Sequence, residues 1–144
     1  MTNKNNSVNN EHWQNFKKIY ARGFNIIEPF LKSQYNTYYR LYFKDGTTIV
    51  VFYMSGNDSD NGLEMDDPDY EELYEFDFIV EKVETRGSKL NLKEGDWIIL
   101  NYRNLFEKFE AYQGVTYGVA KAVLKKWDDA GHSLGRPAKV EENV

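Results

Sequence analysis

The chain has 144 residues and a formal net charge of −5, with 41% hydrophobic residues, 16% aromatic residues and no cysteine. This length is typical of one domain, and the aromatic content supplies a core. The missing cysteine excludes disulfides, thiolate nucleophiles and Cys-ligated metals, and fits a reducing compartment. The first ten residues contain no apolar segment, and residues 48–54, the longest apolar run, are too short to span a bilayer. We therefore expect a cytoplasmic protein.

The N-terminal part of the chain predicts a polar lead-in followed by a helix. Residues 1–10 are almost entirely Asn, Ser, Lys and Thr, and we expect them to be disordered. Trp13, Phe16 and Tyr20 then recur at spacings of three and four, which predicts a helix over about 10–21. Residues 24–31 follow as either a second short helix or an irregular strand.

A β-hairpin is the clearest local prediction. Residues 37–43 and 47–53 are rich in Tyr, Phe, Val, Ile and Thr, and Asp45 and Gly46 lie between them. Asp followed by Gly favours a tight turn because Gly tolerates a positive φ. The hairpin over 37–53 should therefore be part of an antiparallel sheet.

The second half of the chain predicts more strands and a helix. Residues 55–69 are polar and acidic and indicate a long loop, whereas 74–80 alternate between apolar and polar. Two further strands are expected within 97–102 and 105–112, and helical spacing of apolar residues predicts a helix over 115–129. The predicted fold is one α+β domain over 11–131, with a loose tail over 132–144. Its small antiparallel sheet is either open or barrel-like, and helices 11–21 and 115–129 pack on it.

The apolar stripes of these elements predict which side chains are buried. Each stripe needs a shared surface, and the expected core residues are Trp13, Phe16, Phe43, Val51, Phe78, Ile98, Leu124 and Trp127.

No catalytic or cofactor motif emerges from the sequence. The only histidines are His12 and His132, and His132 beside Ser133 indicates an exposed turn rather than a nucleophile and base. Neither phosphate-binding glycine pattern is present. The loop from Asn57 resembles the start of an EF-hand, but its twelfth position is Pro68 where a bidentate Glu is needed. We expect a non-enzyme without cofactor or metal, with weak calcium binding at 57–69 left open.

Charge segregation is the main functional signal. Residues 58–84 contain twelve acids and one base, Lys82, while the rest of the chain contains 11 acids and 17 bases. Such a block steers a basic partner, although it could equally serve solubility alone. The candidate partner-binding residues are Asp58, Asp60, Asp66, Asp67, Asp69, Glu71, Glu72, Glu75 and Asp77.

The alternative site is one face of the hairpin. Tyr38, Arg40 and Tyr42 share that face, and aromatics interleaved with Arg are typical both of a platform for single-stranded nucleic acid and of a core. The net negative charge argues against direct binding of nucleic acid.

The sequence favours a non-catalytic acidic protein that binds a basic macromolecular partner, such as the surface of a nucleic-acid-handling enzyme. An inhibitor or immunity-type accessory protein has this behaviour, and the bias toward Asn, Lys, Tyr and Ile suggests a bacterial or phage origin. The alternatives are a small nucleic-acid-binding sheet module, an enzyme that uses carboxylates alone, and a structural accessory protein.

Overall fold

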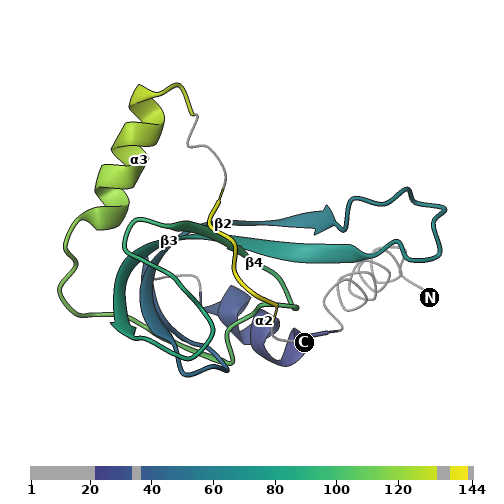
Figure 1. Ribbon diagram of the computed structural model, residues 1–144, viewed down its shortest axis with the longest axis horizontal. Coiled ribbons are helices and arrows are strands. Elements are labelled where there is room, and N and C mark those ends of the chain that lie inside the picture. The colour runs from purple at the N-terminus through teal and green to yellow at the C-terminus, as the bar shows by residue number, and fades with distance from the viewer. Residues whose placement is uncertain (1–21, 34–36, 133–136, 143–144) are drawn as a thin grey trace, which may run out of the picture.

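The computed structural model describes residues 22–33, 37–132 and 137–142. In these ranges the chain has an α+β fold, as predicted, with two helices and one antiparallel sheet (Figure 1). The predicted lead-in over 1–10 and the predicted helix over 10–21, with Trp13 and Phe16, lie outside the described residues. The elements are α2 (Phe24–Lys32), β1 (Tyr38–Tyr42), β2 (Thr48–Asp60), β3 (Glu72–Thr85), β4 (Trp97–Leu100), β5 (Lys108–Ala111) and α3 (Val119–Asp129).

The sheet has five strands in the order β4-β3-β2-β1-β5, and every neighbouring pair is antiparallel. It is open, with β4 and β5 at opposite edges, so the barrel-like alternative is wrong. The predicted hairpin is confirmed, because Tyr38 pairs with Phe52 and Tyr42 pairs with Thr48. Gly46 has a φ of 93° in the turn, which is the conformation that favours glycine there.

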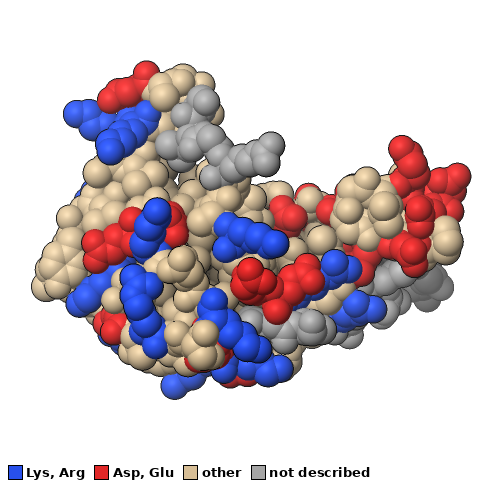
Figure 2. Space-filling view, in the orientation of Figure 1, with Lys and Arg blue, Asp and Glu red and all other residues tan. Residues whose placement is uncertain are grey.

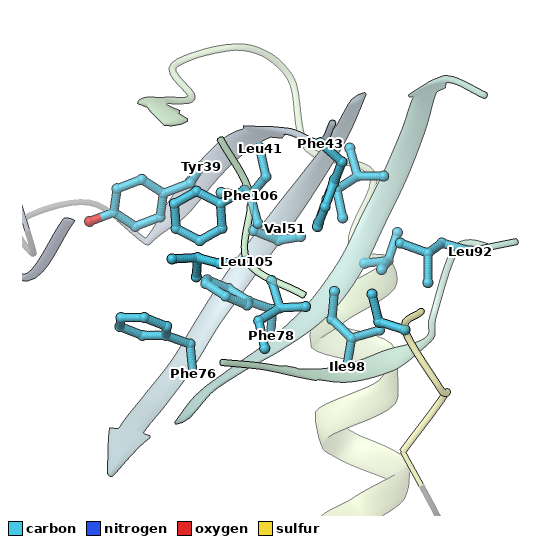
Figure 3. Packing of buried hydrophobic residues seen from close by; sticks show 14 of the residues in the cluster. Tyr39, Leu41, Phe43, Val51, Phe76, Phe78, Leu92, Ile98, Leu105 and Phe106 are labelled. Atoms are coloured by element: carbon cyan, nitrogen blue, oxygen red, sulfur yellow. The ribbon is translucent and has the colours of Figure 1, made fainter. Parts of the chain in front are cut away.

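A single aromatic core lies between α2 and one face of the sheet. Phe30 of α2 is fully buried, and its ring centroid lies 4.8 Å from that of Tyr39 and 5.0 Å from that of Phe76. Figure 3 shows Phe76, Phe78 and other sheet residues meeting in this core. Pro29 left a helix uncertain in the sequence, yet it lies within α2. Burial of Phe30 and the neighbouring Ile27 offsets the roughly 3 kcal/mol cost of a proline in a helix.

The core prediction holds for the sheet but not for the last helix. Phe43, Val51, Phe78 and Ile98 are all buried, as expected. In α3, however, only Ala120 is buried, while Leu124 and Trp127 are partly exposed. Figure 1 shows the reason: α3 starts against β3 and then rises away from the sheet, so its later turns have no sheet beneath them.

Residues 137–142 pack on the sheet edge, in contrast to the loose tail that we predicted over 132–144, of which 133–136 and 143–144 lie outside the described residues. The Ala138 N–H donates to the Trp97 carbonyl at 2.7 Å, and Ala138 forms a parallel bridge with Ile98. Val140 is buried. Residues 137–142 therefore cover part of β4, where apolar residues of both segments meet. Among the described residues, no helix is long and apolar enough to cross a membrane.

Candidate functional site: the acidic arm

A two-stranded ribbon extends from the body where a long loop was predicted. β2 continues to Asp60 and β3 begins at Glu72, so residues 55–60 of the predicted loop are strand, whereas residues 61–69 connect the two strands as a loop. We call residues 56–75 the acidic arm. Among the described residues, β2 and β3 pair only with each other over this range, and Figure 1 shows the arm projecting beyond the sheet.

The base of the arm is shaped by a glycine. Gly56 pairs with Phe76, and a Cβ at Gly56 would overlap the Tyr74 hydroxyl and lie 2.8 Å from the Tyr53 hydroxyl. Real Cβ atoms do not approach other atoms this closely, so a side chain at position 56 would force the ends of both tyrosine side chains to move from where they lie. The aromatic core thereby extends to the start of the arm.

The tip of the arm, residues 61–71, is a structured connection. Asp60 accepts a hydrogen bond from the Gly62 N–H at 2.8 Å, and Asp67 accepts one from the Asp69 N–H at 2.8 Å. The Asn61 side-chain amide donates to the Asp69 carbonyl at 2.7 Å. Short polar side chains that bind nearby backbone in this way stabilise turns. The tip thus holds its acids in a defined arrangement.

Acids lie on both faces of the ribbon. Asp58 pairs with Tyr74 and Asp60 with Glu72, and cross-strand partners share a face. Glu75 alternates with them and therefore lies on the opposite face, as does Asp77 at the base, where it pairs with Ile99 of β4. Asp66, Asp67 and Asp69 occupy the tip. Figure 2 shows acidic residues gathered at the end of the arm.

Glu71 differs from the other candidates because it ties the arm to the body. Its carboxylate lies 3.2 Å from an Arg103 guanidinium nitrogen and 3.8 Å from one of Arg22. A hydrogen bond from Tyr102 lowers the pKa of Glu71; burial opposes the shift and the two arginines add to it. The negative charge of Glu71 is therefore already balanced by the two arginines.

Most of the other candidate acids have no positively charged partner within the described part of the chain. No ion pair to a described residue is formed by Asp60, Asp66, Asp67, Asp69, Glu72, Glu75 or Asp77. The pKa of Glu75 is raised by partial burial and by the nearby Asp77 charge. Partial burial also raises the pKa of Asp77, against a lowering contribution from the Trp97 indole N–H. Burial is the main cause of both shifts, and only the Glu75 shift contains a contribution from neighbouring negative charge.

The alternative hairpin face carries an arginine that is already paired. Arg40 Nε lies 2.5 Å from a Glu84 carboxylate oxygen, and Arg40 Nη1 lies 2.6 Å from Glu110. Tyr42 donates its hydroxyl to Glu110 at 2.7 Å, while Tyr38 packs edge-on against another aromatic ring. Binding phosphate at Arg40 would require breaking both ion pairs, so the geometry does not favour a nucleic-acid platform.

The structure agrees with the rejection of an EF-hand at residue 57 and with an exposed position for His132. Asn57 and Ser59 lie in β2, paired with Glu75 and Leu73, so this segment does not form a calcium loop of EF-hand type. In the described residues, no group of three or more His, Cys, Asp or Glu side chains could hold a metal ion. His132 stacks on Trp127 with ring centroids 4.3 Å apart. Ser133 lies outside the described residues.

Sequence reasoning missed two features of the site. Met65 and Leu63 lie at the tip with 80% and 40% of their surfaces exposed. Their signal was the presence of large apolar residues inside an acidic segment. Glu81 belongs to the acidic block but is only 1% exposed, and it binds the start of α3 instead of facing solvent. Comparison of the chain with protein families, characterised proteins and solved structures finds no match.

Proposed function

We propose that this protein is a non-catalytic acidic binding protein that associates stoichiometrically, through the acidic arm, with a basic macromolecular partner. The observation that carries the proposal is the projecting ribbon with acids on both faces and at its tip, most of them without a compensating cation among the described residues. An inhibitor or immunity-type accessory protein of bacterial or phage origin would act in this way, for example on a nucleic-acid-handling enzyme.

The shape of the arm supports this proposal on electrostatic grounds. Carboxylates at the end of a projection reach a partner before the rest of the surface, and their summed field accelerates encounter with a positive patch. A projecting ribbon also enters a groove more readily than a flat sheet face does. The partner should therefore present a basic cleft rather than a flat surface.

The structured tip supports the proposed binding function on entropic grounds. Asp60, Asn61 and Asp67 already bind backbone groups of the tip, so less conformational entropy is lost on binding. The exposed Met65 supplies an apolar contact at the centre of the charged region. Interfaces commonly place an apolar anchor inside a polar rim in this way.

The test is capture of partners from source cells by immobilised protein at low and high salt. The arm-neutral variant combines Asp66→Asn, Asp67→Asn and Asp69→Asn, which removes three charges, while the amide introduced at position 67 keeps an oxygen that accepts the turn hydrogen bond. The matched control combines Glu94→Gln, Glu107→Gln and Glu141→Gln, all exposed and outside the arm. Wild type and control should retain a basic protein in a one-to-one complex that high salt releases.

The arm-neutral variant should lose that partner while keeping its melting temperature. Equal retention of the partner by the arm-neutral variant would contradict the proposal. The acids would then serve solubility or protect the open strand edges of the ribbon.

A further inference from the structure

We propose that α3 is a second interaction surface whose occupant is the arm tip of another copy of this chain, so that two copies form a two-fold dimer with reciprocal contacts. This inference goes beyond the proposed function, because it assigns a role to α3 and concerns self-association. It predicts that a second copy and the basic partner compete for the same arm.

The first support is the incomplete cover of α3. The residues Val119, Val123, Leu124 and Trp127 recur on one side of the helix, and each is partly exposed. Only Ala120 is buried, because the helix contacts β3 near its start and then leaves the sheet (Figure 1). An apolar stripe of this kind normally packs on another element. The described part of the chain covers it only partly.

The second support is charge complementarity between α3 and the tip. Lys121 and Lys126 border the apolar stripe of α3, Lys125 lies on the opposite side of the helix, and all three are exposed. The tip has the opposite charge, with Met65 exposed beside Asp66. The first two turns of α3 therefore match the tip in both respects, apolar against apolar and lysine against carboxylate, whereas Asp128 and Asp129 at the end of α3 share the charge sign of the tip.

The third support is the position of the two surfaces. Figure 2 shows the basic residues of α3 and the acids of the tip at opposite extremities of the molecule, so the tip does not reach the α3 of its own chain. A second copy related by a two-fold axis can present its α3 to the tip and its tip to α3. Two equivalent contacts then form at once, which strengthens association beyond a single contact.

The experiment uses complementary charge reversal in the full-length chain. The arm-reversed variant combines Glu64→Lys, Asp66→Lys and Asp69→Lys, leaving the Asp67 turn intact. The helix-reversed variant combines Lys121→Glu, Lys125→Glu and Lys126→Glu. A matched control combines Lys44→Glu, Lys89→Glu and Lys139→Glu, which lie outside α3 and are exposed. Sedimentation over a concentration series at low salt measures the dimer dissociation constant, and circular dichroism checks that each variant is folded.

Wild type and control should dimerise, and high salt should weaken both dimers. Each reversed variant alone should have a dissociation constant raised by about tenfold or more, because like charges then meet. An equimolar mixture of the two reversed variants should form mixed dimers again, since both contacts regain opposite charges. A monomeric wild type, an unaffected helix-reversed variant or a mixture that stays monomeric would each overturn the inference. A monomer that still captures a basic partner through its arm would leave the proposed function standing.

Discussion

The buried Glu81 carboxylate of β3 accepts a hydrogen bond from the Ala120 backbone N–H, 2.8 Å away in the first turn of α3. The same carboxylate accepts from the backbone N–H groups of Tyr117 at 2.5 Å and Val119 at 3.3 Å. Gly118, which precedes α3, provides no side-chain cap. A carboxylate on the sheet therefore satisfies the N–H groups that a helix start leaves unpaired, and its charge suits the positive end of the helix dipole.

The first prediction is that Glu81→Ala destabilises the protein by about 2–3 kcal/mol, because buried N–H groups lose their acceptor. Amide exchange should also accelerate in α3 more than in β1 or β2. Glu81→Gln keeps one oxygen acceptor and should cost less. Urea unfolding and hydrogen exchange measure both effects, with the exposed Glu94→Ala as control. An unchanged unfolding free energy for Glu81→Ala would show that Glu81 does not hold α3.

The sequence predicted the elements whose signals are local. The turn at Asp45 and Gly46 and the β-rich runs around it were enough to place the hairpin. The extension of β2 to Asp60 was missed because residues 55–60 are polar or glycine and therefore show no apolar alternation. Contacts between residues that are distant in the sequence were not predictable either. If the alternation over 74–80 continued, Glu81 would face solvent. The pairing of β3 with β2 instead skips Glu81 between Val80 and Lys82, and the start of α3 covers its side chain.

The acidic site was predictable as a composition but not as a surface. The nine candidate residues were identified from charge alone, and the ribbon brings most of them together on one projection. Glu71 could not be separated from the others, because its partner Arg103 lies far along the chain. The pairing of Arg40 with Glu84 and Glu110 depends on strand order in the same way.

The second prediction concerns pH and Asp45. Burial raises the pKa of Asp45, but N–H groups of Leu90, Thr47 and Lys89 outweigh it and hold the pKa at about 2. Because the folded pKa is depressed, the stabilisation is present above the unfolded value near 4 and is lost as pH falls toward 2. Asp45→Asn should therefore cost about 1–2 kcal/mol at neutral pH, after allowance for solvent screening.

The difference between wild type and Asp45→Asn should shrink through the same pH range. Urea unfolding at a series of pH values measures it, and Glu94→Gln provides an exposed control. A difference that stays constant from pH 7 to pH 3 would mean that the carboxylate charge at Asp45 contributes nothing.

The third prediction has the opposite sign and concerns Asp77. Burial raises its pKa in the folded state, so the ionised form is disfavoured by folding. The penalty is absent below the unfolded pKa and grows as pH rises through the folded value. Asp77→Asn should therefore raise the melting temperature at pH 7 and leave it unchanged at low pH, since the amide is neutral at both pH values and the wild-type carboxyl is neutral only at low pH. Calorimetry at both pH values tests this, and a lower melting temperature at pH 7 would contradict it.

The last prediction separates the charges of the arm from its apolar tip by kinetics. Long-range attraction acts before contact, so the arm-neutral variant should associate with the captured partner more slowly, with little change in the dissociation rate. Its association rate should also depend less on salt than that of wild type. Met65→Ser removes a contact made only in the complex and should mainly accelerate dissociation at every salt concentration.

Surface plasmon resonance with the immobilised partner measures both rates, and the variant with Glu94, Glu107 and Glu141 neutralised serves as the control for net charge. Single-stranded DNA on a second surface tests the rival function, because a nucleic-acid binder would bind more tightly once phosphate repulsion is reduced. An arm-neutral variant whose association rate falls no further than that of the control would show that net charge, and not the arm, directs the encounter.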